Sequence, residues 1–394
     1  MTDRERLFDI VDGLYDQYME LYRKIVTHET YSTDKEAIDS LVAFLCVVAD
    51  HKGYEHKVVP FERAGNGLLL TLNPDAKLPG IALCGHMDTV HPKGSFKEPV
   101  FRIEGNKVFG PGVFDMKGGL IIGLLVMETL SKYGFKDRPV KFIFVPDEER
   151  SEGLSGEPGK KFIIDSAKGC AAALTLEGGT DPKGVTVGRK GSIRYHVTVQ
   201  GVAAHAGSSY AKGRSAIKEA SHKILDIEAP SIPDQITYNC GMITGGTSPN
   251  TVPEFCEFML YNRYWTEDQY KELRAHVEGI LAKQFIPDTK TTFEVIGERY
   301  PMEASEKNIA LAEELSRVSQ ECGFGPLEAQ RKNSGSDACY TAMAGVPSVC
   351  SIGPIGENAH MLSEFSYADS ISKRAKLISA FIAGLRADFG VQDA

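Results

Sequence analysis

The sequence predicts an α/β protein in which a mostly parallel sheet is interrupted by an inserted α+β domain. Strand-like apolar runs alternate with helical patterns over residues 1–187, which is typical of a layered α/β domain. Residues 188–299 instead follow the order β-α-β-β-α-β of a ferredoxin-like unit. The α/β pattern returns over residues 300–394. We therefore expect one domain formed by 1–187 and 300–394, with a second domain of 188–299 inserted into it.

The periodicity of apolar residues places the elements of the first domain. Spacings of three and four residues indicate helices, and short apolar or alternating runs indicate strands. The glycine pair at 118–119 precedes an unbranched apolar segment, which we interpret as a buried helix. The expected helices are 7–26, 34–50 and 120–130, and the expected strands are 56–61, 67–73, 81–84, 140–145 and 171–176.

The same criteria place the elements of the inserted domain and of the C-terminal part. Residues 185–201 alternate between apolar and polar side chains, which predicts one long strand. The inserted domain is expected to add strands at 237–243, 257–264 and 291–295 and helices at 214–225 and 267–284. A helix at 309–322, a strand at 348–351 and a final helix at 368–389 are expected to complete the first domain.

Composition restricts the class of protein. Hydrophobic residues make up 42% of the 394 residues and charged residues 25%, as in an ordinary globular protein, which excludes wholesale disorder. A net charge of −9 without a basic block argues against a nucleic-acid partner, and no apolar run approaches the roughly 18 residues of a membrane span. The eight cysteines are scattered, and the N-terminal segment lacks the apolar core of a signal peptide, so we expect a cytoplasmic protein.

Acidic and imidazole side chains follow the predicted strands at their carboxyl ends, where α/β sheets bind ligands. His86 and Asp88 follow the strand at 81–84, and Glu177 follows the strand at 171–176. Glu148 and Glu149 follow the strand at 140–145, Asp115 lies in a glycine-rich turn, and His360 follows the strand at 348–351. A single such residue is usually structural, but two histidines and three acids together suit Zn²⁺ or a similar divalent ion. The further carboxylate of Glu148 is then available to take a proton from metal-bound water.

Five motifs occur in one order along the chain. They are His-x-Asp at 86–88, Gly-x-x-Asp-Met-Lys-Gly-Gly at 112–119, Asp-Glu-Glu at 147–149, an acid at 177 and Asn-x-His at 358–360. In this combination the sequence resembles the M20 metallopeptidases, the group of ArgE, DapE and carboxypeptidase G2, over nearly the whole chain. The resemblance implies a phosphorylase/hydrolase-like catalytic domain that holds two zinc ions, and an inserted domain that serves as lid and dimerisation domain.

The resemblance also implies a role for each residue of the site. Asp115 would bridge two Zn²⁺ ions, for which Co²⁺ or Mn²⁺ are alternatives. His86 and Glu177 would complete the first metal site, and Glu149 and His360 the second. Glu148 would act as general base and then as proton donor to the leaving amine, and Asp88 would orient the His86 ring. The peptide bond between Asp115 and Met116 is expected to be cis.

In the inserted domain, the segment Gly-Val-Ala-Ala-His-Ala-Gly ending at residue 207 resembles the histidine loop of the family lid. His205 would stabilise the oxyanion, often in the site of a partner subunit, and Asn250 and Arg263 would bind the free carboxylate of the substrate. Gly356 is a candidate for a backbone contact with substrate. A histidine on a surface loop and an arginine in an ion pair are the structural alternatives for His205 and Arg263. We expect a homodimer formed through residues near 200–230.

The implied activity is hydrolysis of the amide bond of peptides or N-acyl amino acids with a free C-terminal carboxylate. Glutamate at position 177 accompanies carboxypeptidases and deacylases in this family, so the glutamate carboxypeptidase branch is the leading hypothesis. A deacylase of the acetylornithine or succinyl-diaminopimelate type and a tripeptidase or dipeptidase are the alternatives. A non-catalytic ligand-binding relative is disfavoured because Glu148 and all ligand candidates are present, and a serine hydrolase because no Gly-x-Ser-x-Gly elbow occurs. His91 is interpreted as structural or as lining the rim of the site.

Overall fold

The computed structural model describes residues 2–150 and 153–389, and the chain divides into two compact units. Unit 1 comprises Met1–Gly188, Ala304–Arg331 and Ser336–Ala394. Unit 2 comprises Arg189–Glu303 and the short segment Lys332–Gly335. The sequence places the inserted domain at 188–299, and the compact unit additionally contains residues 300–303.

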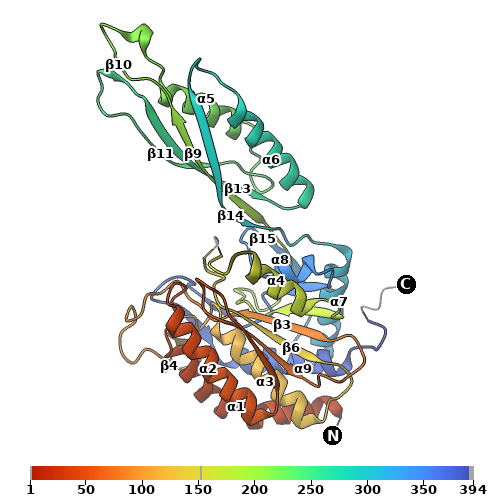
Figure 1. Ribbon diagram of the computed structural model, residues 1–394. Coiled ribbons are helices and arrows are strands. Elements are labelled where there is room, and N and C mark those ends of the chain that lie inside the picture. Colours follow the sequence, from red (N-terminus) through yellow and green to blue (C-terminus); the bar gives the residue numbers. More distant parts are fainter. Residues whose placement is uncertain (1, 151–152, 390–394) are drawn as a thin grey trace. The chain divides into compact units, whose positions relative to one another are not determined.

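Unit 1 is built on an eight-stranded sheet with the strand order β1-β2-β6-β3-β7-β16-β8-β15 (Figure 1). The strands are β1 (Glu55–Val59), β2 (Gly67–Leu72), β3 (Ile81–His86), β6 (Val140–Val145), β7 (Ala172–Thr175), β8 (Gly184–Arg189), β15 (Glu328–Lys332) and β16 (Ser348–Cys350). The central strands β6, β3, β7 and β16 run parallel, whereas β1, β2 and β8 pair antiparallel to their neighbours. The α/β class is therefore confirmed, and the sheet is mixed, with its parallel part in the centre.

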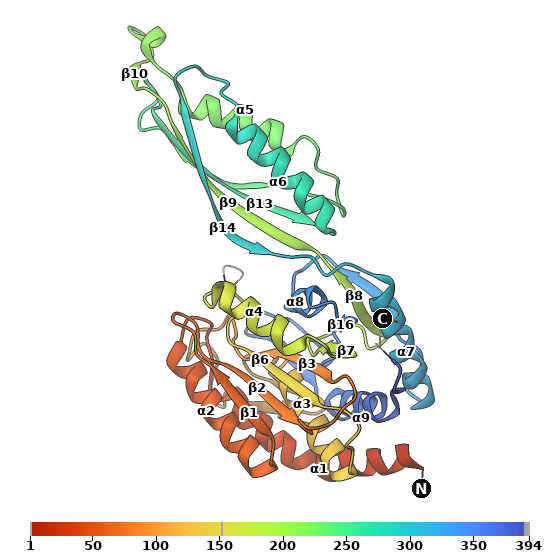
Figure 2. The same ribbon diagram turned by 45° about the vertical axis from the view of Figure 1, so that its right-hand side comes forward.

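Helices cover both faces of this sheet (Figures 1 and 2). One face carries α1 (Asp3–Val26), α2 (Lys35–Lys52), α3 (Lys117–Tyr133), α7 (Glu306–Glu321) and α9 (Ala368–Gly384), and the other carries α4 (Gly156–Ala167) and α8 (Ala338–Met343). Local signals set several helix ends: Thr2 forms a capping box with Glu5, and Gly53 and Gly134 end α2 and α3 in the left-handed conformation. The final helix ends at Gly384, before the expected residue 389.

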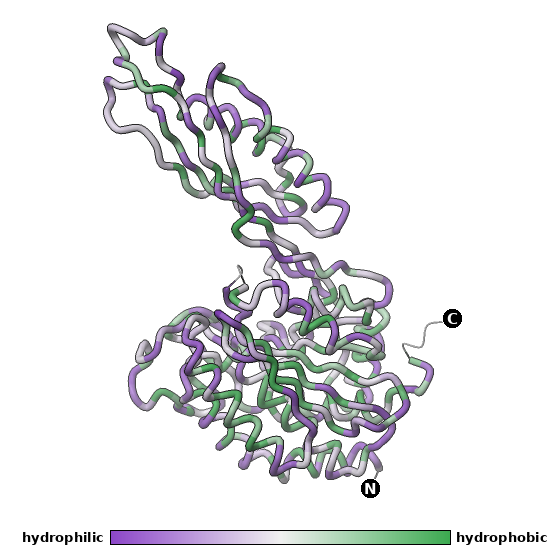
Figure 3. Tube along the Cα trace, viewed as in Figure 1, coloured by the Kyte–Doolittle hydropathy of each residue, from purple (hydrophilic) through white to green (hydrophobic). Residues whose placement is uncertain are grey.

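Burial on both faces explains the apolar character of the central strands. All six residues of β3 are buried, and α3 is buried from Lys117 through Leu130, as expected for a helix enclosed in the core. Figure 3 shows the corresponding hydrophobic segments in the middle of unit 1. At about 1.5–3 kcal/mol for each fully buried large apolar side chain, this core holds the strand ends rigidly in place. The residues that follow those strands are thereby positioned for the site described below.

Unit 2 contains a four-stranded antiparallel sheet in the order β11-β13-β9-β14, with α5 (Ala216–Glu228) and α6 (Glu267–Ala282) packed on one face (Figure 2). Its strands are β9 (Gly191–Gln200), β11 (Cys240–Gly245), β13 (Phe255–Tyr264) and β14 (Lys290–Arg299). The single strand predicted at 185–201 was wrong, because the chain breaks at Lys190 and continues as β8 and β9 in different sheets. Residues 188–192 contain no large apolar side chain, but the apolar residues on both sides of them fall on odd-numbered positions, so the alternation keeps its phase and does not reveal the break.

Short elements surround the two sheets. A second sheet in unit 1 joins β4 (Arg102–Glu104), β5 (Lys107–Phe109), β17 (Gly356–Glu357) and β18 (Phe365–Tyr367). In unit 2, β10 (Ala204–His205) pairs with β12 (Thr251–Val252), and a 3-10 helix spans Tyr210–Lys212. Across residues 2–150 and 153–389, no helix is long and apolar enough to cross a membrane.

Candidate metal centre

The predicted metal ligands of unit 1 converge at one edge of the central sheet. His86 is the last residue of β3, and Glu149 and Glu177 closely follow β6 and β7. Because these three strands are parallel neighbours, their carboxyl ends lie side by side. Asp115 joins them from the turn before α3, and His360 from the segment after β17. The sheet topology therefore explains how residues far apart in sequence meet.

Asp115 lies between the two imidazole rings. Its Oδ1 is 3.2 Å from His86 Nε2, and its Oδ2 is 3.3 Å from His360 Nε2. A second acid lies near each imidazole ring. Glu177 Oε2 is 3.9 Å from His86 Nε2, and Glu149 Oε2 is 3.1 Å from His360 Nε2. The five side chains thus form two groups that share one carboxylate, which is the arrangement expected for a bridged pair of metal ions.

Glu148 faces the same cluster from the position next to Glu149. Its carboxylate, a nitrogen of His86 and a carboxylate oxygen of Glu177 all lie within 4.8 Å of one another. A second triplet at this spacing consists of His86, Asp115 and Glu149. The adjacent acids at 148 and 149 therefore both reach the cluster, although only one of them is an expected ligand.

The pKa values of these side chains are shifted because the side chains are buried and lie close to one another. Burial alone would lower the pKa of His86, but hydrogen bonds with Asp115 and Asp88 raise it well above its ordinary value. Hydrogen bonds with Asp115 and Glu149 raise the pKa of His360 to about 11. Burial raises the pKa of Glu149 to about 8, with the Asp115 charge adding to the effect. Without metal, Glu149 and the two imidazoles therefore retain protons that bound cations would displace.

The donor set fits a pair of divalent cations. Burial would raise the pKa of Asp115, but hydrogen bonds from His360 and His86 outweigh this effect and lower the pKa well below its ordinary value, so the carboxylate is ionised. Glu149 Oε1 is buried and has no hydrogen-bond partner among residues 2–150 and 153–389, as a ligand atom awaiting a cation would be. Imidazole nitrogens and carboxylate oxygens are the ligands of Zn²⁺ and related ions.

Asp88 connects the ligand-bearing loops behind the cluster. The carboxylate is fully buried, and its Oδ1 lies 3.2 Å from His86 Nδ1. It accepts hydrogen bonds from the backbone N–H groups of Glu148 (3.1 Å) and Glu149 (3.2 Å) and from Ser32 Oγ (2.6 Å). One side chain therefore fixes both the His86 ring and the loop of the two adjacent acids, which supports the orienting role expected from the sequence.

Glu364 is a functional candidate that the sequence analysis missed. Its buried carboxylate accepts hydrogen bonds from the backbone N–H groups of Gly112 (3.1 Å), Phe114 (2.8 Å) and Asp115 (2.9 Å). It also follows His360 closely in sequence, so it connects the Asp115 turn to the His360 segment. Proximity to a ligand motif is the only sequence signal for this role.

The neighbourhood of Glu364 also settles two smaller expectations. His91 is buried, with Nε2 3.4 Å from Glu364 Oε2 and its ring edge-on to Phe96, so it is structural and does not line a rim. The peptide bond between Asp115 and Met116 is cis, as the resemblance implies.

Gly356 has a clear packing reason to be glycine. A Cβ atom at this position would lie 2.2 Å from Phe365 O, and the N–H group of Gly356 donates to Gly179 O (3.3 Å). The backbone contact with substrate proposed for this residue stays a prediction.

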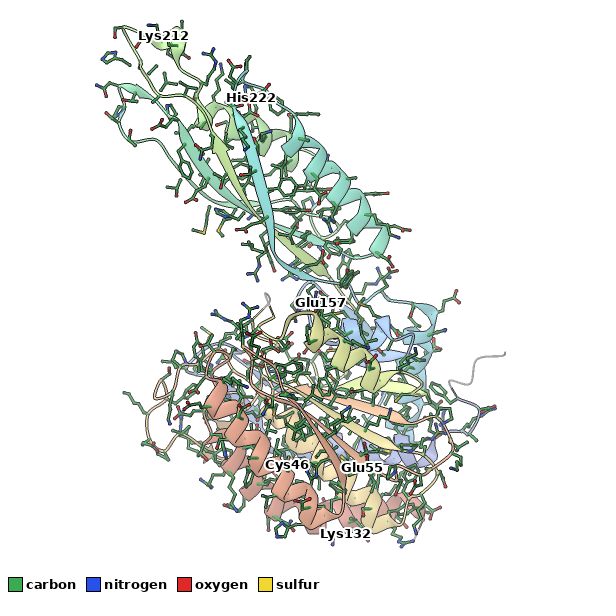
Figure 4. All side chains as sticks on the ribbon, in the orientation of Figure 1. Cys46, Glu55, Lys132, Glu157, Lys212 and His222 are labelled. Carbon is green, nitrogen blue, oxygen red and sulfur yellow. The ribbon has the colours of Figure 1, made fainter. Side chains whose placement is uncertain are left out.

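In unit 2, the structure brings His205 and Asn250 together. β10 pairs with β12, and the Ala206 N–H donates to Asn250 O (2.8 Å). His205 Nδ1 accepts hydrogen bonds from the N–H groups of Gly207 and Ser208, both 3.1 Å away. The neutral ring therefore carries its proton on Nε2, where it is a hydrogen-bond donor. Figure 4 labels Lys212 in the 3-10 helix beside this end of the unit.

Arg263 lies in β13 of the four-stranded sheet, at the end away from Asn250. It pairs with Ser192 in the β13–β9 ladder, whereas Phe255, close to Asn250 in sequence, pairs with Gln200 at the far end. At about 3.4 Å per residue, roughly 25–30 Å of strand separates these ends. Burial lowers the pKa of Arg263, and no ion pair joins it to an acidic side chain among the described residues. The ion-pair alternative for Arg263 is therefore not supported.

Comparisons with known proteins agree with this geometry. The model of peptidase family M20/M25/M40 matches residues 82–384. Carboxypeptidase G2 of Pseudomonas sp. (strain RS-16) is 28% identical over 92% of this chain and 88% of its own length. A succinyl-diaminopimelate desuccinylase of Alkalilimnicola ehrlichii is 23% identical, covering 76% of this chain and 82% of the relative.

Solved structures share the fold at low identity. A tripeptidase of Staphylococcus aureus superposes with a TM-score of 0.76 at 19% identity, covering 94% of this chain and 98% of that one. The Bacillus subtilis YXEP protein, described as a dinuclear metal binding peptidase from the M20 family, has a TM-score of 0.68 at 13% identity over 94% and 98% of the two chains. With the family model covering most of the chain and two ligand groups sharing Asp115, the chain belongs to peptidase family M20/M25/M40 and is a metal-dependent hydrolase.

Proposed function

We propose that the protein hydrolyses the amide bond of peptides or N-acyl amino acids that carry a free C-terminal carboxylate, as a glutamate carboxypeptidase does. The observation that carries this proposal is the pair of ligand groups sharing Asp115, with Glu148 beside them. Glutamate at position 177, and the similarity to carboxypeptidase G2 over nearly the whole chain, favour the carboxypeptidase branch.

The side chains of unit 1 divide the proposed chemistry among themselves. His86, Asp115, Glu149, Glu177 and His360 would hold two Zn²⁺ ions, which when bound polarise the scissile carbonyl and lower the pKa of water. Glu148, adjacent to this cluster, takes the proton of the attacking water and delivers it to the leaving amine. Asp88 keeps the His86 ring and the Glu148 backbone in place during both proton transfers.

The side chains of unit 2 would recognise the substrate. Arg263, which lacks an acidic partner among the described residues, offers a planar fork to a carboxylate. Asn250 is expected to add a hydrogen bond to the same group. His205 donates from Nε2 to the oxyanion, and the two backbone hydrogen bonds to its Nδ1 favour that tautomer.

A homodimer accounts for the separation of these residues. Arg263 and the His205–Asn250 pair lie at opposite ends of a ten-residue strand ladder, so one chain does not present both to the same small substrate. We propose that the tip of one chain completes the site of its partner. Large apolar side chains exposed near residues 200–230 and on the edge strand β11 support such an interface: Val202, Tyr210, Ile217, Leu225, Met242 and Ile243.

Two finer points belong to the same proposal. Zinc is the expected metal, with Co²⁺ or Mn²⁺ as alternatives, because the ligands are nitrogen and oxygen atoms only. A cytoplasmic location is proposed because none of the eight cysteines, all within the described residues, forms a disulfide, and four of them, among them Cys84 and Cys350, are buried inside unit 1.

The alternative function is an N-acyl-amino-acid deacylase. The similarity to a succinyl-diaminopimelate desuccinylase over most of the chain favours it, since the bond that breaks is also an amide. The two activities differ in the acyl group and in the side chain of the released amino acid.

Product identification by mass spectrometry tests the proposal. Zinc-loaded protein would be incubated with aminobenzoyl-glutamate, N-acetylornithine, N-succinyl-diaminopimelate and short peptides, each with and without chelator and with the Glu148→Ala variant. Release of glutamate that stops with chelator and in the variant supports the carboxypeptidase function. Release from only the acetyl or succinyl substrates supports the deacylase, and release of an N-terminal residue from a peptide overturns both.

A further inference from the structure

A cavity of about 320 Å³ lies in unit 1, and none of the predicted metal ligands lines it. It is bounded by the end of α7, the first turns of α9 and the segments around Pro182 and Ile355. Most of its wall is apolar, formed by Phe324, Leu327 and Leu377 among others. This volume is in the range of sites for small organic ligands.

One of the two charged residues in this wall is Arg374, on α9. Its side chain is only 5% exposed, yet in the described part of the chain its guanidinium makes one hydrogen bond, from Nη2 to Pro182 O at 3.3 Å. A guanidinium has five N–H donors, so most of them have no acceptor among the described residues. Burial lowers the pKa of Arg374 to about 10, which leaves the group charged at neutral pH.

No carboxylate of the described residues forms an ion pair with this cation. Asp181 is near enough to influence Arg374, but its oxygens accept hydrogen bonds from Lys183 N (2.9 Å) and Gln330 Nε2 (2.7 Å). The other cation of the wall, Lys373, is exposed and paired with Asp369 at 2.6 Å. A largely buried guanidinium that forms no ion pair with the described residues is only partly compensated, so an anion from outside the chain would be stabilised here.

The two helix ends at the cavity differ in the charge that they favour. α9 begins at Ala368, so its positive end is on the side of Arg374 and Ser370. α7 ends near Ser319, but the carbonyls of Ser319 and Gln320 accept hydrogen bonds from the N–H groups that follow the helix. The positive character of the cavity is therefore concentrated on the α9 side.

We propose that this cavity binds a small organic carboxylate. The carboxylate would lie against the free donors of Arg374, which match its planar geometry, and an apolar substituent would pack on Phe324 and Leu327. The bound molecule would also contact Ile355, which precedes His360 in the same segment. This site is independent of the substrate proposed above, because it shares no residue with it.

Methyl NMR of the zinc-loaded full chain tests the proposal. Phenylacetate would be titrated against isoleucine-labelled protein, with phenylacetamide as the neutral probe of the same shape. The Ile355 signal, assigned by its loss in the Ile355→Val variant, should shift and saturate with phenylacetate. Phenylacetamide should bind at least about tenfold more weakly, since the charge-assisted hydrogen bonds are lost. Equal shifts with both probes, or none with phenylacetate, would overturn the proposal.

Two variants and a control locate the binding. Arg374→Gln should weaken phenylacetate binding by about tenfold or more, whereas Lys373→Gln, which alters a cation already paired, should leave the affinity nearly unchanged. Leu327→Trp keeps Arg374 but fills the cavity, and should also abolish the saturable shift. The Leu327→Trp variant takes the place of Arg374→Gln in this test if the melting curve of Arg374→Gln shows that this variant does not fold. Unchanged binding in both variants would show that the carboxylate lies elsewhere.

Discussion

The two units place their functional side chains in opposite ways. In unit 1, the ligand candidates follow buried parallel strands, and the carboxylates of Asp88 and Glu364 fix the loops that carry them through backbone N–H groups. In unit 2, His205 and Asn250 lie on an exposed tip, and Arg263 lies at the far end of the sheet. Unit 1 brings its expected metal ligands together within one chain, whereas the residues of unit 2 are separated, and our proposal is that a second chain completes their site.

The strongest disruption of the unit 1 arrangement is Asp115→Asn. In the wild type the Asp115 carboxylate belongs to both ligand groups. We therefore expect the variant to lose both metal sites together and its turnover to fall below detection. Elemental analysis after dialysis against zinc measures the metal content. Asp165→Asn, at an exposed ion pair with Lys161, is the matched control and should retain full content. Retention of one metal per chain by the Asp115 variant would contradict shared ligation.

Glu148→Gln tests the division of labour between the two adjacent acids. The variant should lower kcat by about 10²–10⁴-fold, because proton transfer is lost while the metal ligands remain. KM and metal content should stay close to those of the wild type. Glu157→Gln, at an exposed residue labelled in Figure 4, is the control for a charge change alone. A variant that loses its metal instead would make Glu148 a ligand.

His205→Ala tests the tip of unit 2. Loss of an oxyanion donor should lower kcat by about 10²–10³-fold without loss of metal. Arg263→Gln should raise KM, because it removes the proposed partner of the substrate carboxylate.

Mixing these two inactive variants then distinguishes one-chain from two-chain sites. If the tip acts in the partner's site, random reassociation should restore up to about a quarter of wild-type sites. No recovery in subunit-exchange conditions would mean that each chain completes its own site.

Glu364→Gln tests the support behind Asp115. The amide retains one acceptor oxygen but places an NH₂ group against backbone donors, so we expect metal affinity to fall by about 10–100-fold. Competition with a fluorescent chelator measures this affinity without reference to activity. Glu357→Gln, at a nearby exposed residue, should have no effect. Equal affinities of the Glu364 variant and the wild type would limit the residue to a packing role.

The smallest expected effect is a pH dependence in unit 2. Hydrogen bonds with Glu294 and Glu257 raise the pKa of His196 above its ordinary value. The interaction of protonated His196 with these two acids stabilises the folded state. This stabilisation is complete at pH values below the unfolded pKa of about 6.5, and it is lost as the pH rises through the folded pKa. These acids are exposed, so the contribution is a few tenths of a kcal/mol. Denaturant unfolding of wild type and His196→Gln should differ more at pH 6 than at pH 9.

Parallel strands make the metal centre predictable from the sequence. The carboxyl ends of such strands meet at one edge of the sheet, so the acids and histidines that follow them are expected to lie together. Glu364 was not predicted because its role depends on the three N–H groups from which it accepts hydrogen bonds, and no spacing encodes that contact.

Two elements that the sequence analysis did not predict, α4 and β15, have local sequences that do not favour the structure they adopt. α4 contains Pro158 and Gly159, which lower helix propensity, and tertiary packing on the sheet overrides it. β15 is rich in charged residues and lacks an apolar pattern, because it is an edge strand with little burial.

The main segment of unit 2, Arg189–Glu303, begins and ends at one place. Arg189 N donates to Met302 O (2.8 Å), and Met302 N donates to Arg189 O (3.0 Å), so the two ends of this long excursion are neighbours. A segment whose ends adjoin can be gained, lost or exchanged without altering the path of the remaining chain. Evolution can therefore vary unit 2 as a module while unit 1, with its candidate metal centre, stays constant. The same pair of residues marks where a laboratory could graft the unit of one relative into another.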